Sequence, residues 1–314
     1  MIEVGDDMGK VKKRRIRIKW KNLIIALIIL TLLIIGIIQG TTSLYRLATK
    51  KTDTSIKDKS NVKKLTEKEK KLKTLGNVQN KIDYFNEDYI DRYIQYKKNH
   101  KKLENIQIIK DVNMNLDKTP YEDITEAKHL NTNTILVNKY YYVEENYVPN
   151  ELESIDRKYA LSNMRLVKPA KEAFEELSKK AQEENLNIIA MSTYRSYSYQ
   201  VNLYNRYVKK DGKEIADTYS GRPGHSEHQT GLAVDVYNKE EDYTNFEITK
   251  EFEWMQEHAH EYGFILRFPK DKENETGYKY ESWHYRYVGI DVATYIHQNN
   301  ISLEEYYATK IKDW

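Results

Sequence analysis

The pattern of apolar and polar positions changes character several times along the chain. Residues 22–45 carry no charged side chain, and their centre, Leu23 to Ile38, is almost entirely leucine and isoleucine. These twenty-four residues would span about 36 Å as a helix, which is enough to cross the hydrocarbon core of a bilayer. Backbone groups in lipid need internal hydrogen bonds, so a spanning segment has to be helical. We therefore predict one N-terminal transmembrane helix over residues 22–45.

The charges before this segment predict its orientation. Residues 1–21 carry a dense basic cluster of Lys10, Lys12, Lys13, Arg14, Arg15, Arg17, Lys19 and Lys21. Basic flanks stay in the cytoplasm, so we expect a basic cytoplasmic tail, a single-pass anchor in the cell membrane and an extracellular C-terminal part. A cleaved signal peptide is the alternative. Gly40 could mark its cleavage site, but no A-x-A-like pattern is present and the apolar run is long for a signal core.

The next two segments differ in hydrophobicity. Residues 46–80 are rich in Lys, Thr, Asp and Ser and lack a wide apolar face, so we interpret them as a charged stalk. Residues 81–133 form a lead-in region. Apolar and aromatic residues recur at helical spacing from Ile82 to Tyr96, which predicts a helix, and Ile106–Val112 is expected to be a short strand.

Residues 134–314 alternate irregularly between helical and extended patterns. The clearest helix is 168–185, whose alanine, phenylalanine and leucine residues fall on one side. Further helices are predicted at 197–209, 251–262, 294–299 and 303–307, and strands at 134–137, 186–192, 232–237, 264–268 and 283–288. This order predicts an α+β fold with a small, largely antiparallel sheet flanked by helices.

Composition narrows the possible chemistry. The chain has no cysteine, which excludes a disulfide framework, a thiolate nucleophile and a cysteine-based zinc site. Its net charge is only +3 despite the basic N-terminus, and we expect no nucleic-acid partner. The 27 tyrosines suit the lysine-rich composition as well as they suit ligand binding, so we infer no function from them.

The first chemically informative segment is residues 224–236, a glycine-containing loop that leads into a strand. Alternate residues of a strand face the same side. The core side is expected to receive Leu232, Val234 and Val236, and the other face Gly231, Ala233 and Asp235. Two very small side chains beside one carboxylate leave space for a metal and a substrate. A buried carboxylate also needs compensation, which a zinc ion would supply.

The second segment, residues 280–289, holds Glu281 and His284. Positions three apart face opposite sides of a regular strand, so the two side chains meet only if Glu281 precedes the strand or lies at a bulge. Two histidines and one carboxylate are typical ligands of a catalytic zinc ion that leaves one position open for water. A free carboxylate nearby can take the proton of that water, and Glu281 suits the role.

These segments resemble the VanY-type D-alanyl-D-alanine carboxypeptidases, zinc peptidases related to the VanX-type dipeptidases and the L,D-carboxypeptidases. The S-x-H-x-x-G-x-A-x-D pattern of the family stands at Ser226–Asp235, its E-x-W-H pattern at Glu281–His284, and its Y-R-S-Y-x-x-Q element at Tyr194–Gln200. Residues 135–139 and 259–264 add to the resemblance, which covers about residues 134 to 308. It implies a D-Ala-D-Ala carboxypeptidase/hedgehog-like fold for the zinc carboxypeptidase domain, residues 134–314.

The resemblance also implies residue roles. The matching Zn²⁺ ligands are His228, Asp235 and His284. Glu281 matches the catalytic base, and Arg195 matches the arginine that pairs with the substrate carboxylate or the developing oxyanion. Gln200 and Ser226 match positions that contact the terminal D-amino acid. An arginine is also expected on physical grounds, because a carboxypeptidase has to recognise a free carboxylate and a guanidinium binds it with two hydrogen bonds.

Two positions depart from the family pattern, and two functional alternatives stay open. Ser282 stands where the family often has proline, and Thr193 where glycine is frequent, which could shift loop geometry. The expected activity is removal of the C-terminal D-alanine from peptidoglycan stem peptides by a monomeric catalytic domain. The alternatives are L,D-carboxypeptidase activity on tetrapeptide stems and a non-catalytic module that binds the cell wall. Glu227, next to His228, is interpreted as a carboxylate that stabilises the loop.

Overall fold

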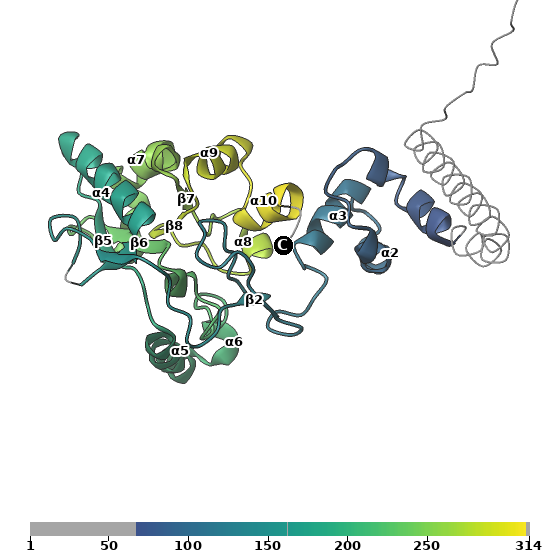
Figure 1. Cartoon of the computed structure of the whole chain (residues 1–314), viewed down its shortest axis with the longest axis horizontal. Helices are drawn as coiled ribbons and strands as arrows, with labels where there is room; N and C mark the ends of the chain where they lie inside the picture. Colours follow the sequence, from purple (N-terminus) through teal and green to yellow (C-terminus); the bar gives the residue numbers. More distant parts are fainter. Residues whose placement is uncertain (1–66, 162, 312–314) are drawn as a thin grey trace, which may run out of the picture. The chain divides into compact units, whose positions relative to one another are not determined.

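The computed structural model of the chain describes residues 67–161 and 163–311 (Figure 1). The compact unit Lys71–Trp314 holds every element discussed below. The predicted basic tail (1–21), transmembrane helix (22–45) and most of the stalk (46–80) lie outside the described residues. Within the described part, no helix is both long and apolar enough to cross a membrane.

The lead-in region is a small helical module. Its elements are η1 (Val78–Asn80), η2 (Glu87–Tyr89), α2 (Ile90–Asn99) and α3 (Asn105–Asn113). The apolar side chains of these elements form their own buried cluster of Leu75, Val78, Tyr93, Ile108, Ile109 and Val112. The packed module therefore includes residues on the N-terminal side of the expected boundary at residue 81.

Two expectations for the lead-in region need correction. The helix predicted from Ile82 starts later, because the Asn86 side chain accepts a hydrogen bond from the backbone of Asp88 and caps a 3-10 turn there. The strand predicted over Ile106–Val112 is wrong, since this segment lies within α3. Its isoleucines and valine are spaced so that one helix face packs against Tyr93, and this tertiary contact outweighs the strand preference of branched side chains.

A four-stranded sheet forms the centre of the larger domain, which corresponds to the domain predicted over residues 134–314. Its strand order is β5-β6-β8-β7, and each neighbouring pair is antiparallel. The strands are β5 (Ile189–Ser192), β6 (Ala233–Tyr237), β7 (Phe264–Leu266) and β8 (His284–Tyr287). These segments lie within four of the predicted strands and confirm a largely antiparallel α+β fold.

Two short strand pairs lie outside this sheet. They are the parallel pair β1 (Thr125–Glu126) with β2 (Tyr141–Tyr142) and the antiparallel pair β3 (Leu152–Ser154) with β4 (Arg165–Val167). The strand predicted at Thr134–Val137 is wrong, because residues 135–137 are buried without strand pairing. Side-chain nitrogen Nη2 of Arg286 donates instead to the carbonyls of Asn133 (3.1 Å) and Ile135 (2.6 Å).

Helices cover the sheet on two sides (Figure 1). They are α4 (Lys168–Glu183), α5 (Tyr197–Asp211), α6 (Lys213–Ala216), α7 (Lys250–His258), α8 (Glu273–Thr276), α9 (Ile290–Asn299) and α10 (Leu303–Lys310), with the 3-10 turns η3 (Glu227–Thr230), η4 (Tyr243–Ile248) and η5 (Ala259–Tyr262). The apolar face of α4 enters the main core, where Phe174 meets Phe264 of β7 edge to face. The amphipathic helix predicted at 168–185 is thereby confirmed.

Helix α10 links the lead-in module to the larger domain. Lys110 of α3 pairs with Glu305 of α10 at 2.5 Å. The Asn113 amide donates to the carbonyl of Ala308 at 3.1 Å, and the Asn115 amide donates to the Tyr141 hydroxyl at 2.9 Å. The lead-in module is therefore tied to the same helix that contributes a buried glutamate beneath the candidate site.

Candidate metal centre

Three neighbouring strands place polar side chains side by side. Asp235 of β6 lies opposite Ser192 of β5 on one side and opposite His284 of β8 on the other. The β5–β6 register shifts between Ala190 and Ser192, and irregularities of this kind often redirect side chains beside active sites. Leu232, Val234 and Val236 enter the main core as predicted, and Ala233 and Asp235 lie on the other face of β6. Gly231 was wrongly placed on that face: it precedes the strand with a positive φ, and a side chain there would meet Leu152 and Val167.

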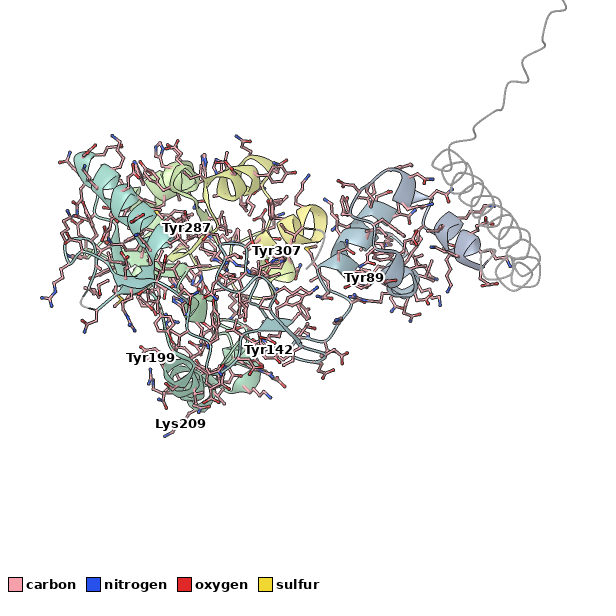
Figure 2. All side chains as sticks on the ribbon, viewed as in Figure 1. Tyr89, Tyr142, Tyr199, Lys209, Tyr287 and Tyr307 are labelled. Atoms are coloured by element: carbon pink, nitrogen blue, oxygen red, sulfur yellow. The ribbon has the colours of Figure 1, made fainter. Side chains whose placement is uncertain are left out.

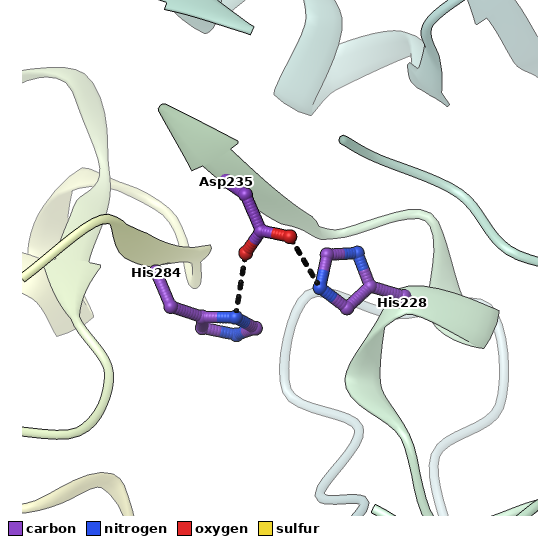
Figure 3. A group of neighbouring side chains, drawn as sticks. All are labelled: His228, Asp235 and His284. Carbon is purple, nitrogen blue, oxygen red and sulfur yellow. Dashed lines mark hydrogen bonds and ion pairs between the residues drawn. The ribbon is translucent and has the colours of Figure 1, made fainter. Parts of the chain in front are cut away.

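The third donor comes from the turn before β6. His228 lies in η3, and its Nδ1 is 2.6 Å from the carbonyl oxygen of Thr193. The backbone N–H of Arg195 donates in turn to the carbonyl of His228 at 3.1 Å. These two contacts fix the ring so that Nε2 faces Asp235, as Figure 3 shows.

The three donor groups match the geometry of a zinc ion. Asp235 Oδ2 is 3.3 Å from His228 Nε2, and Asp235 Oδ1 is 3.0 Å from His284 Nδ1. All three residues offer donor atoms within 4.8 Å of one another, and no second such group occurs among the described residues. Ligands held about 2.1 Å from a tetrahedral zinc lie roughly 3.4 Å apart, so the side chains need only small shifts to bind one.

Glu281 reaches this group through a turn. Residues 282–283 form the turn, and β8 starts at His284, so the backbone bends between Glu281 and Trp283 as its proposed position requires. Glu281 Oε2 lies 3.7 Å from His284 Nδ1. Burial and the nearby Asp235 carboxylate raise the pKa of Glu281 to about 7, against the opposing effects of His284 and Arg195. A carboxyl with such a pKa can both accept and release a proton near neutral pH.

The two histidines have opposite electrostatic environments. Burial and the Arg195 charge lower the pKa of His228 to about 4. Burial alone would also lower the pKa of His284, but the carboxylates of Asp235 and Glu227 raise it to about 9. Burial opposes the charge of Asp235, yet His228 and Arg195 hold its pKa well below the usual range. His228 is therefore a neutral donor, whereas His284 carries a proton that a bound cation would displace.

Arg195 contacts one of the candidate metal donors directly. Its Nη2 donates to Asp235 Oδ2 at 2.6 Å and to the Ser192 hydroxyl at 2.7 Å, and its Nε also donates to that hydroxyl at 3.0 Å. No acceptor among the described residues pairs with Nη1. The guanidinium is therefore held in place by the strand residues and has one donor edge left. Its role toward substrate stays a prediction.

Gln200 and Ser226, the predicted substrate contacts, line the same cavity of about 560 Å³ as the metal donors, Glu281 and Arg195. The Gln200 amide donates to the carbonyl of Gly221 at 2.8 Å. Its buried Oε1 has no hydrogen-bond partner among the described residues, which leaves an acceptor for a bound ligand. Ser226 is buried immediately before η3. All seven residues selected from the sequence therefore meet at one cavity.

The sequence did not reveal the aromatic walls of this cavity. They consist of Tyr199, Tyr207, Tyr219, Tyr243, Phe268, Tyr278, Tyr280 and Trp283. Tyr199 projects from α5 (Figure 2), where positions 199, 200, 203, 207 and 211 all line the cavity. This spacing of three to four residues marks one helix face. Combined with Gln200, it could have identified the α5 wall.

A buried ionic network, also not anticipated, lies behind His284. Glu227 Oε1 accepts from Arg267 Nε at 2.9 Å and from Arg286 Nη1 at 2.8 Å. Arg267 also makes two hydrogen bonds to Glu304 of α10, at 2.8 and 2.6 Å. Burial would raise the pKa of Glu227, but the two guanidinium groups hold it well below its usual range. These contacts exceed the loop-stabilising role expected of Glu227.

Comparison with known proteins places this geometry in context. The model of the family described as "VanY: D-alanyl-D-alanine carboxypeptidase" matches residues 163–290. The "Putative carboxypeptidase YodJ" of Bacillus subtilis (strain 168) is 37% identical over 182 residues, which cover 55% of this chain and 66% of that protein. The matched part thus spans just under two thirds of this curated relative.

Two solved structures share the fold at 34% identity each. The structure of the LdcB LD-carboxypeptidase aligns with a TM-score of 0.56, covering 61% of this chain and 92% of that one. The structure of VanYB in complex with D-alanine-D-alanine aligns with a TM-score of 0.50, covering 57% and 98%. Both alignments include nearly the whole of the solved chain.

Proposed function

The chain belongs to the VanY family of D-alanyl-D-alanine carboxypeptidases, and we propose that it is a zinc-dependent hydrolase that removes the C-terminal D-alanine from peptidoglycan stem peptides. The observation that carries this proposal is the convergence of three metal donors, a partly buried glutamate and a partly buried arginine at one cavity. A cavity of about 560 Å³ also suits the end of a peptide.

Each residue at the cavity has a distinct part in this proposal. Bound by His228, Asp235 and His284, zinc supplies Lewis acidity toward water and the scissile carbonyl. Glu281 takes a proton from the attacking water and returns it to the leaving amine, for which its raised pKa is suited.

Side chains on either side of the metal donors orient the substrate. Arg195 offers Nη1 to the terminal carboxylate or to the developing oxyanion, while Ser192 and Asp235 hold its other nitrogens. Gln200 Oε1 accepts a hydrogen bond from a substrate N–H, because its own amide nitrogen is already bonded to Gly221. Ser226 borders the terminal D-amino acid.

The bond cleaved is proposed to be the D-alanyl-D-alanine bond of pentapeptide stems. VanYB, which shares the fold, has been captured with D-alanine-D-alanine, and this supports the choice. The similarity to the LdcB LD-carboxypeptidase favours a second candidate, the bond between an L-centre and D-alanine in tetrapeptide stems. Both substrates end in a free D-alanine carboxylate, so the same arginine and metal donors serve either one.

The proposed substrate agrees with the predicted location of the chain. A transmembrane helix over residues 22–45 with a basic cytoplasmic flank would put the catalytic domain outside the cell. Peptidoglycan stems are found there. Reporter fusions placed after residue 45 test this topology, and cytoplasmic reporter activity would contradict it.

The activity is tested by incubating the full-length protein, in detergent, with purified tetrapeptide and pentapeptide stems and following D-alanine release by mass spectrometry. We expect release from pentapeptides, loss of release after chelation, and recovery with Zn²⁺. Glu281→Gln should bind zinc but turn over roughly a hundredfold to ten-thousandfold more slowly. Glu251→Gln is the matched control, because Glu251 is buried away from the cavity. Wild-type protein that binds no zinc, or full activity in Glu281→Gln, contradicts the proposal.

A further inference from the structure

Two buried polar atoms face each other behind the metal donors. His284 Nε2 and Glu227 Oε2 are both inaccessible to solvent, and neither has a hydrogen-bond partner among the described residues. They lie 3.7 Å apart. One can carry a proton and the other can accept it, so a shift of less than 1 Å would join them in a hydrogen bond of ordinary length.

The carboxylate is rigidly held from its other oxygen. Glu227 Oε1 accepts from Arg267 and Arg286, whose side chains are fully buried. Arg267 is fixed in turn by two hydrogen bonds to Glu304. Two cations on one oxygen keep the carboxylate ionised and leave Oε2 as a free acceptor aimed at the ring. Such a carboxylate is a poor proton acceptor in catalysis, which agrees with Glu281 as the base.

The orientation of the ring assigns its two nitrogens to different partners. Nδ1 lies 3.0 Å from Asp235 Oδ1, on the side of the metal donors, so Nε2 points away from them toward Glu227. Metal binding through Nδ1 needs a lone pair there and therefore a proton on Nε2. Histidines that bind metals usually donate this second N–H to an oxygen, which fixes the tautomer and strengthens the ligand.

We propose that Glu227 is the positioning residue of the metal centre: its Oε2 accepts the Nε2–H of His284 and thereby holds Nδ1 ready for the metal. The inference rests on the proposed zinc site. The Thr193 carbonyl oxygen has the same role for His228: it lies 2.6 Å from Nδ1 and orients the ring. The two histidine ligands thus differ, since one is held by a neutral backbone oxygen and the other by an anion anchored through Arg267 to α10.

The test is Glu227→Gln in the full-length protein, compared with wild type and with Glu251→Gln. Glu251 is a suitable control because it is also buried and also accepts hydrogen bonds, from Asn187 and Asn238, at a distance from the metal donors. A glutamine at position 227 can keep its oxygen toward the arginines, which turns its amide N–H groups toward His284 Nε2. That arrangement favours the wrong tautomer and places the ring proton on Nδ1.

Zinc affinity, measured by competition with a chromogenic chelator, should fall about tenfold to a hundredfold in Glu227→Gln and stay within about twofold of wild type in Glu251→Gln. A second measurement needs no variant. In the zinc-loaded wild type, ring-nitrogen NMR should show a proton on His284 Nε2, shifted strongly downfield by a carboxylate acceptor.

The outcomes separate the two proposals. Wild-type protein that binds no zinc overturns the proposed function and this inference with it. Wild-type protein that binds zinc, with unchanged affinity in Glu227→Gln or with no downfield Nε2 proton, overturns the inference alone. If Glu227→Gln does not fold, the wild-type NMR signal decides. Weaker zinc binding in Glu227→Gln together with the downfield proton supports the positioning role.

Discussion

The metal donors and the ionic network lie on opposite sides of the His284 ring, and their buried charges are compensated in different ways. Behind His284, the two arginines and two glutamates of the network balance one another within the protein. In front of it, the Asp235 and Glu281 carboxylates, Arg195 and two histidines surround a cavity. Buried ions need partners in either case. The network has its partners permanently, whereas the donor group is completed by a ligand.

This difference indicates which of the buried charges are functional. The network pairs two arginines with two glutamates, and although burial opposes the charge of Glu227, the guanidinium groups hold its pKa well below its usual range. The donor group contains groups whose pKa values are pushed apart, with His228 at about 4, Glu281 at about 7 and His284 at about 9. Divergent pKa values at one cavity are typical of active sites.

The largest effect is expected from Asp235→Asn. Losing this anion removes the donor that lies between the two histidines, so zinc binding should be abolished and turnover should fall by roughly a thousandfold or more. Zinc content by atomic emission and D-alanine release check the prediction. Retained zinc in this variant would mean that the metal uses other ligands.

Substitutions in the ionic network should lower the unfolding free energy of the protein. Arg267→Met leaves Glu227 without one of its cations and Glu304 without its guanidinium partner, which should cost about 3–5 kcal/mol of unfolding free energy. The double variant Arg267→Met/Glu304→Gln removes one of these stranded charges and should recover part of the loss. Urea unfolding of the zinc-free proteins measures both. Equal destabilisation in the single and double variants would show that packing, not charge, sets the cost.

Zinc should raise the unfolding free energy through the donor group, in addition to what the network contributes. At a free zinc concentration about a hundredfold above the Kd, the unfolding free energy should rise by about 2.7 kcal/mol, and EDTA should reverse the gain. Arg267→Met is expected to keep only part of this increment, because Arg286 still holds Glu227 near His284 while the Arg267 contact is lost. Thermal scans with and without metal test this prediction, and complete loss of the increment in this variant would contradict it.

The smallest effect is expected from removing the ion pair between the lead-in module and α10. Lys110 and Glu305 form a partly exposed pair at 2.5 Å, so Lys110→Ala should cost at most about 1 kcal/mol and leave zinc affinity unchanged. A chelator competition alongside urea unfolding would detect either change. A clear drop in zinc affinity would instead mean that the module positions Glu304 and, through Arg267, the metal ligand.

The sequence by itself pointed to the candidate donor residues through two short motifs, whose resemblance to the VanY family implied the ligand set. Asp235 is recognisable from its alternation with core residues along one strand, and the turn that Glu281 requires is present between Glu281 and His284. Helices 168–185 and 197–209 were also predictable, since each has a continuous amphipathic repeat. Short apolar runs were a weaker guide: four strands predicted from them are present, but those expected at 106–112 and 134–137 are wrong.

Only the tertiary structure decided which distant residues meet. Nothing in the local pattern places Arg267, Arg286 and Glu304 beside Glu227, because their partners lie on other strands and helices. The aromatic cavity walls likewise come from separate segments. Periodicity reports which face of an element is buried, but the partner of a buried charge depends on chain packing. The sequence therefore indicated the candidate metal donors, and the fold determined what holds them in place.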